Sequence, residues 1–220
     1  LQKTITLQPD FALPFFILGN IHLDFKEYEL AVSNYQKAIE INSQLSGAHN
    51  NLGLVFRILN DFENAISCYK KAIKIKSNYP GAHHNLALAF KESGKFDEAV
   101  IAHEMAIKHE PKNLVNYYYL SDLKKEILNE DLKEKIKKIL QNNKSSKNNI
   151  AYGNFLLSKY DNKLKNYEKE FNYLIAGHQN FYDSNKAKFD LAIKYSFENL
   201  PQIHEDAEVE TVGKENSSDI

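Results

Sequence analysis

The chain is poor in the residues on which several classes of protein depend. Its 220 residues include a single cysteine, Cys68, which excludes an internal disulfide framework. Arg57 is the only arginine among 28 basic residues, and bidentate recognition of phosphates or bases relies mainly on arginine. The formal net charge of −1 offers no broad attraction to nucleic acid or anionic lipid. The composition therefore predicts partners that are neither nucleic acids nor membranes.

Signatures of catalysis and of membrane insertion are missing as well. The eight glycines are scattered along the chain, and they form no glycine-rich phosphate loop. No apolar run approaches the roughly 18 residues that a membrane-spanning helix requires. We therefore predict no catalytic residue, no cofactor and no metal ligand in this chain, and we expect a cytoplasmic location.

The sequence does contain a strong internal period. Small and aromatic residues recur at one constant spacing, at Gly19, Gly53 and Ala87, at Ala31, Ala65 and Ala99, at Ala38, Ala72 and Ala106, and at Tyr35, Tyr69 and His103. The spacing is 34 residues in every case. A fixed period of this length indicates a stacked repeat architecture, because one short unit cannot bury its own apolar face. Arrays of this kind mostly serve as binding surfaces.

The pattern resembles the tetratricopeptide repeat, a helix-turn-helix unit of about 34 residues. Complete units are assigned to Ala12–Leu45, Ser46–Tyr79 and Pro80–Asn113. The resemblance implies an all-α fold, a right-handed α-solenoid of paired antiparallel helices. Asn60 and Gly94 are expected to supply the turn inside a unit, because Asn and Gly tolerate left-handed geometry.

The segments outside these units follow the period less strictly. We expect the end of a truncated upstream repeat in residues 1–11, three units in 12–113, a degenerate helical segment in 114–200, and an acidic disordered tail or linker in 201–220. Within the degenerate segment, helices are predicted at Leu114–Leu128, Ile150–Tyr160, Tyr167–Gln179 and Asn185–Asn199. Because the chain starts inside a repeat, we expect a fragment of a longer protein.

Several histidines have two possible interpretations. His49, His83 and His84 fall on successive first helices, where they could form a metal site. However, His49 and His83 stand where the repeat family often has an aromatic residue, which favours a packing role. His103 and His109 do not share one helix face at metal-protease spacing and are expected to lie in solvent.

The concave wall of the array is the candidate binding site. The resemblance places the groove positions of the family at Phe16, Asn20, Asn50, Asn51, Leu54, Arg57, His84, Asn85, Leu88 and Lys91. Asn51 and Asn85 are equivalent residues, and their stacked amides could bind the backbone of an extended peptide. Alternatively, these amides cap or solvate the helix face. Arg57 and Lys91 would favour acidic segments.

A second resemblance concerns Ile150–Gln179. The stretches Tyr167–Phe171 and Leu174–Gly177 are similar to the connector that follows repeat arrays in bacterial sulfotransferases, although His178 stands where that family often has Asn. Two functions follow. The first is a protein-protein interaction scaffold that binds peptide segments of a partner. The alternative is the substrate-recognition arm of a sulfotransferase or glycosyltransferase whose catalytic domain lies beyond residue 220.

Overall fold

The computed structural model describes residues 11–141 and 145–199, and every regular element within these ranges is a helix. Three helix pairs come first: α2 (Ala12–Asp24) with α3 (Tyr28–Ile41), α4 (Ser46–Ile58) with α5 (Phe62–Ile75), and α6 (Pro80–Glu92) with α7 (Phe96–His109). The pairs begin at the first residues of the three predicted units, and the prediction of an all-α solenoid is confirmed. The truncated repeat expected in residues 1–10 and the tail expected in 201–220 lie outside the described residues.

Each pair is held together by a close approach of its two helices. A Cβ atom built on Gly53 of α4 would lie 2.8 Å from the ring of Tyr69 of α5, and the first pair repeats this contact. The Tyr69 ring is fully buried. In the third pair Ala87 and His103 occupy the equivalent positions, and both are fully buried. The third pair therefore has alanine in place of glycine, and the smaller imidazole ring in place of the tyrosine ring.

The turn inside each pair uses one left-handed residue. Lys26, Asn60 and Gly94, which are equivalent residues of the three pairs, have φ angles of 61°, 61° and 78°. In the second pair, the amide of Asp61 then donates to the carbonyl oxygen of Phe56 at 2.8 Å, as in the Schellman motif. The turn roles predicted for Asn60 and Gly94 are confirmed, whereas Lys26 adopts the same geometry without the freedom of glycine.

A polar contact also recurs between successive pairs. His49 and His83 each place Nε2 against a backbone carbonyl oxygen six residues earlier, at 3.1 and 3.2 Å. Tyr117 donates its hydroxyl to the equivalent carbonyl at 3.2 Å. Burial lowers the pKa of both histidines. These contacts support the packing interpretation of His49 and His83.

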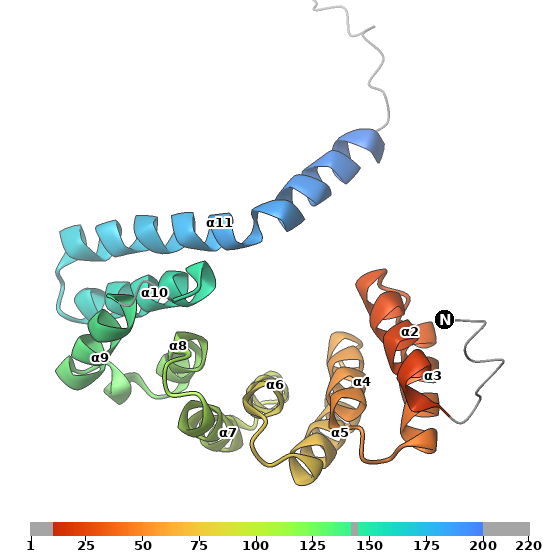
Figure 1. Ribbon diagram of the computed structural model, residues 1–220. Helices are drawn as coiled ribbons and strands as arrows, with labels where there is room; N and C mark the ends of the chain where they lie inside the picture. The colour runs from red at the N-terminus through yellow and green to blue at the C-terminus, as the bar shows by residue number, and fades with distance from the viewer. Residues whose placement is uncertain (1–10, 142–144, 200–220) are drawn as a thin grey trace, which may run out of the picture.

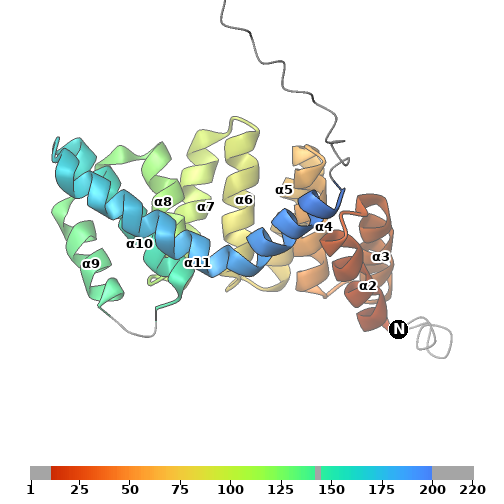
Figure 2. The same ribbon diagram turned by 90° about the horizontal axis from the view of Figure 1, so that it is seen from above.

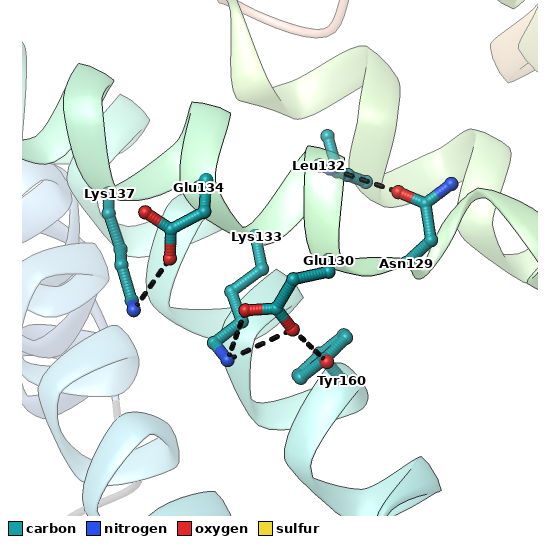
Figure 3. Close-up of polar contacts among 7 residues, drawn as sticks. All are labelled: Asn129, Glu130, Leu132, Lys133, Glu134, Lys137 and Tyr160. Atoms are coloured by element: carbon teal, nitrogen blue, oxygen red, sulfur yellow. Dashed lines mark hydrogen bonds and ion pairs between the residues drawn. The ribbon is translucent and has the colours of Figure 1, made fainter.

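The array departs from the period after residue 113. Helix α8 (Leu114–Leu123) stops earlier than predicted, and a 3₁₀ turn (Lys125–Ile127) leads into α9 (Glu130–Leu140). Helix α9 differs from a second repeat helix, because Lys133 and Lys137 stand at the small and aromatic positions of the repeat frame. Figure 3 shows the ion pairs that these lysines form with Glu130 and Glu134. The hydroxyl of Tyr160 also donates to Glu130.

The last two helices form a hairpin of the repeat type. Helix α10 (Lys147–Lys163) turns through left-handed Lys165, with a φ angle of 60°, into α11 (Tyr167–Asn199). The prediction of two separate helices between residues 167 and 199 was wrong, because α11 is continuous. Its middle contains no proline, and Asn180 and Asn185 donate to carbonyl oxygens four residues earlier, at 2.8 and 2.9 Å. Because these bonds occupy the side-chain amides within the helix, neither asparagine interrupts it.

The helices are arranged as an arc. In Figure 1, α2, α4, α6 and α8 lie along its inner side, and α11 covers α10. Figure 2 shows the second half of α11 running diagonally over the open side of the arc. The inner helices therefore supply the concave wall on which a ligand would lie.

Among the described helices, none is long and apolar enough to cross a membrane.

Replacing Ala65 by leucine tests the packing of a pair. Ala65 is fully buried, and its carbonyl oxygen lies 3.1 Å from a Cβ built on Gly53. Overpacking should lower the free energy of unfolding by roughly 1–3 kcal/mol. Urea denaturation measures this change. The matched control is Ala187→Leu at an exposed position of α11, which should leave the midpoint nearly unchanged. Equal midpoints for both variants would contradict the packing described.

Candidate peptide-binding groove

A hydrogen-bonded row of amides runs along the concave wall. Asn85 donates to Asn50 at 3.1 Å, Asn50 donates to Asn51 at 3.0 Å, and Asn51 donates to Asn20 at 2.8 Å. The Tyr35 hydroxyl also donates to Asn20 at 2.8 Å. The row crosses the first three helix pairs from α6 to α2. The amides thus bind one another, a role that neither sequence-based interpretation included.

The first member of the row has a structural cause. Tyr35 is fully buried, burial raises its pKa to about 12, and its hydroxyl needs an acceptor that Asn20 provides. In the next pair Leu54 replaces this asparagine. The equivalent hydroxyl, that of Tyr69, has no hydrogen-bond partner within the described part of the chain. Asn20 therefore accepts the hydrogen bond of a buried hydroxyl group and also forms the α2 end of the row.

The row retains hydrogen-bonding capacity at its two ends. Among the described residues, the amino group of Asn20 and the amide oxygen of Asn85 take part in no hydrogen bond. Each side-chain amide carries two N–H donors and an oxygen with two lone pairs, so the inner members can also accept further bonds. Asn50 is buried, while the other three are half-buried. The row thus offers a donor near α2 and an acceptor at α6.

The two predicted cations of the groove are paired. Arg57 contacts the carboxylate of Glu92 at 2.7 Å, and Lys91 lies 3.7 Å from the carboxylate of Asp122. Lys91 also stands over the ring of Tyr119, 5.8 Å from its centroid. Each positive charge therefore already has a carboxylate partner from the following first helix, and its attraction for an acidic segment is weaker than the sequence suggested.

The apolar members of the predicted set are less uniform. Phe16 packs against the ring of Tyr35 with 6.1 Å between the centroids, so it belongs partly to the core. Leu54 and Leu88 are half-buried on α4 and α6. They accompany the amide row without a polar role.

Two histidines share one amide oxygen where α6 and α7 meet α8. Nδ1 of His84 lies 2.7 Å from Oδ1 of Asn116, and Nδ1 of His103 lies 3.3 Å from the same atom. His103 is fully buried, and burial lowers its pKa to about 4. The prediction that His103 lies in solvent was wrong, because it fills the aromatic slot of its pair. Tyr119 stacks on it with a 6.0 Å centroid distance.

The structure adds a pocket that the sequence reasoning missed. A cavity of about 850 Å³ lies between α8, α10 and α11. Its aromatic lining consists of Tyr118, Tyr119, Tyr152, Phe155, His178 and Phe181. Tyr118 and Tyr119 continue the repeat frame from His84 and Asn85. Carrying the repeat frame one helix further would have placed these two tyrosines on the concave wall. The side chains of α10 and α11 that line the pocket follow no repeat pattern.

Metal binding has no candidate site in the described ranges. No group of three or more His, Cys, Asp or Glu side chains lies close enough together there to hold an ion. The contacts of His49, His83 and His84 with carbonyl and amide oxygens give these residues structural roles.

The buried imidazole of His103 predicts a pH-dependent stability. Its pKa is about 4 in the folded chain against a usual value of 6.5, so between these values protons bind preferentially to the unfolded state. The stabilisation is therefore complete above pH 6.5 and lost as the pH falls towards 4. His103→Gln should reduce the fall in unfolding free energy from pH 7 to pH 4.5 by roughly 1–3 kcal/mol. Equal falls in parent and variant, measured by urea denaturation, would contradict this.

Comparison with known proteins identifies the repeats. A family model described as TPR repeat matches residues 19–57 and 54–94, and a second, described as Tetratricopeptide repeat, matches residues 82–115. A comparison with curated proteins gave no significant match. Because the family matches lie within residues 19–115, the resemblance of Ile150–Gln179 to a sulfotransferase connector stays a prediction.

Solved structures share the fold at low sequence identity. The Arabidopsis OM64 TPR domain has a TM-score of 0.50 and 24% identity, over 52% of this chain and 94% of that domain. The first TPR of Spaghetti (RPAP3), bound to the HSP90 peptide SRMEEVD, has a TM-score of 0.51 and 21% identity, over 54% and 94%. MamA has a TM-score of 0.55 and 19% identity, over 74% and 86%. The chain is therefore an α-solenoid that carries tetratricopeptide repeats over residues 19–115.

Proposed function

We propose that this chain is a protein-interaction scaffold whose concave groove binds an extended peptide segment of a partner protein. The amide row from Asn20 to Asn85 carries the proposal, because it presents donors and acceptors along the wall. A peptide backbone offers one donor and one acceptor per residue, so side-chain amides can pair with it whatever its sequence.

The mutual bonding of the amides favours this role. Side chains that are already fixed lose little further rotamer freedom when a ligand arrives, which reduces the entropic cost of binding. Asn51 and Asn85 are half-buried, so part of each residue stays accessible to a ligand. The row therefore acts as a preorganised polar track rather than as a set of mobile surface groups.

A peptide is also the kind of ligand seen with this fold. The first TPR of Spaghetti (RPAP3) was solved with an HSP90 peptide bound. In the present chain, Arg57 and Lys91 are paired with carboxylates, so we assign them a secondary role in the groove. Backbone recognition by amides is the main contribution in this proposal.

The test uses a phage-displayed library of random peptides, panned against the immobilised chain. Peptides that are enriched should bind the double variant Asn51→Ala with Asn85→Ala roughly tenfold more weakly, since each lost hydrogen bond costs about 0.5–1.5 kcal/mol. Calorimetric titration gives the affinities, and circular dichroism confirms the fold. The matched control replaces Asn34 and Gln36 of the outer helix α3 by alanine.

The control should bind like the parent chain, because the Asn34 side chain donates to the carbonyl oxygen of Leu30 on its own helix and to no other group among the described residues. Unchanged affinity of the folded double variant would contradict the groove assignment. A library that yields no enriched peptide would contradict the function itself.

A further inference from the structure

We infer that the cavity between α8, α10 and α11 is a specificity pocket for one aromatic side chain of an acidic peptide segment. The inference rests on the proposed peptide-binding function and adds a preference to it. It concerns residues of α10 and α11, which lie outside the matched repeats.

The lining suits an aromatic ring. Tyr118 and Tyr152 meet with 5.2 Å between their centroids at 67°, and Tyr152 meets Phe155 at 6.1 Å and 87°. Phe181 of α11 lies 6.3 Å from Tyr152, again nearly perpendicular. Rings packed edge to face offer both faces and edges to a further ring.

The charges at the pocket favour an acidic ligand. Three ammonium groups, those of Lys125, Lys159 and Lys163, line it against two carboxylates, those of Asp122 and Glu170. The Asp122 carboxylate is moreover shared, because Lys159 lies 2.5 Å and Lys91 3.7 Å from it. The surplus is positive, so a segment with Asp or Glu beside its aromatic residue is attracted.

A cationic ligand is disfavoured at the same place. The Lys159 ammonium group lies 3.7 Å from the centroid of the Tyr118 ring, and it also donates to the hydroxyl of Ser121 at 3.1 Å. The face of the Tyr118 ring is thus already occupied by a lysine of the chain. A second cation would meet like charge there.

The pocket continues the amide row. Tyr119 lies 5.4 Å, between ring centroids, from His84, which precedes Asn85 at the end of the row. Asn51, Asn85 and Tyr119 also occupy the same position of successive units. A peptide whose backbone follows the row towards α8 therefore brings a side chain to the mouth of the pocket.

The experiment uses the peptides enriched from the phage library. We expect them to share an aromatic residue with Asp or Glu within a few positions. The chain contains no tryptophan, so a synthetic version with tryptophan at the aromatic position can be titrated by its own fluorescence. Replacing that tryptophan by alanine should weaken binding at least tenfold. Replacing the acidic residues by their amides should weaken it about threefold to tenfold.

A variant of the chain links this preference to the pocket. Lys125→Glu, at an exposed position, should weaken the acidic peptide about threefold to tenfold and leave its amide version nearly unchanged. Lys74→Glu, exposed on the outer helix α5, is the charge-matched control and should alter neither affinity.

The outcomes separate the two proposals. Peptides that depend on Asn51 and Asn85 but tolerate the loss of the aromatic residue would overturn the pocket and leave the groove intact. Equal effects of Lys125→Glu and Lys74→Glu would also overturn it. The absence of any enriched peptide would overturn both the pocket and the groove.

Discussion

The array depends on one contact, made in the first two helix pairs between a glycine and a buried tyrosine ring, at positions that buried Ala87 and His103 take in the third pair. At Gly19 and Gly53 the opposing tyrosine occupies the space that a Cβ would need, so the helices approach more closely than larger residues allow. Close-packed interiors do not absorb added atoms without strain. This approach fixes each pair as a rigid unit, and rigid units of equal length stack into a regular arc.

The regular arc in turn aligns corresponding side chains along the concave wall. Residues about one period apart stand side by side on neighbouring first helices, so Asn50 and Asn85 meet across two units. The same ring that fixes a pair also extends the row, since the Tyr35 hydroxyl donates to Asn20. Core packing and groove chemistry are therefore coupled at one tyrosine. Where the period ends, tyrosines replace the amides and the wall becomes an aromatic pocket.

The sequence predicted what its period governs and failed where contacts are not periodic. The repeats and the left-handed turns at Asn60 and Gly94 follow from residue types at fixed spacing. The burial of His103 was missed because its polar side chain was given more weight than the repeat position that it shares with Tyr35 and Tyr69. The pocket depends on α10 and α11, whose position against α8 no local pattern encodes. The amide row could not be predicted from the sequence either, because spacing alone does not distinguish amides that bond to one another from amides that face solvent.

The most direct test of this account is a double-mutant cycle that transfers the contact of the third pair into the second. Gly53→Ala should destabilise the chain by roughly 1–3 kcal/mol because its methyl group meets the Tyr69 ring. Tyr69→His should also destabilise, although the lost hydroxyl has no partner among the described residues. Together they place in the second pair the two residue types that occupy these positions, fully buried, in the third pair, namely those of Ala87 and His103. Urea denaturation should then reveal a favourable coupling of about 1 kcal/mol or more, whereas additive effects within about 0.5 kcal/mol would contradict the account.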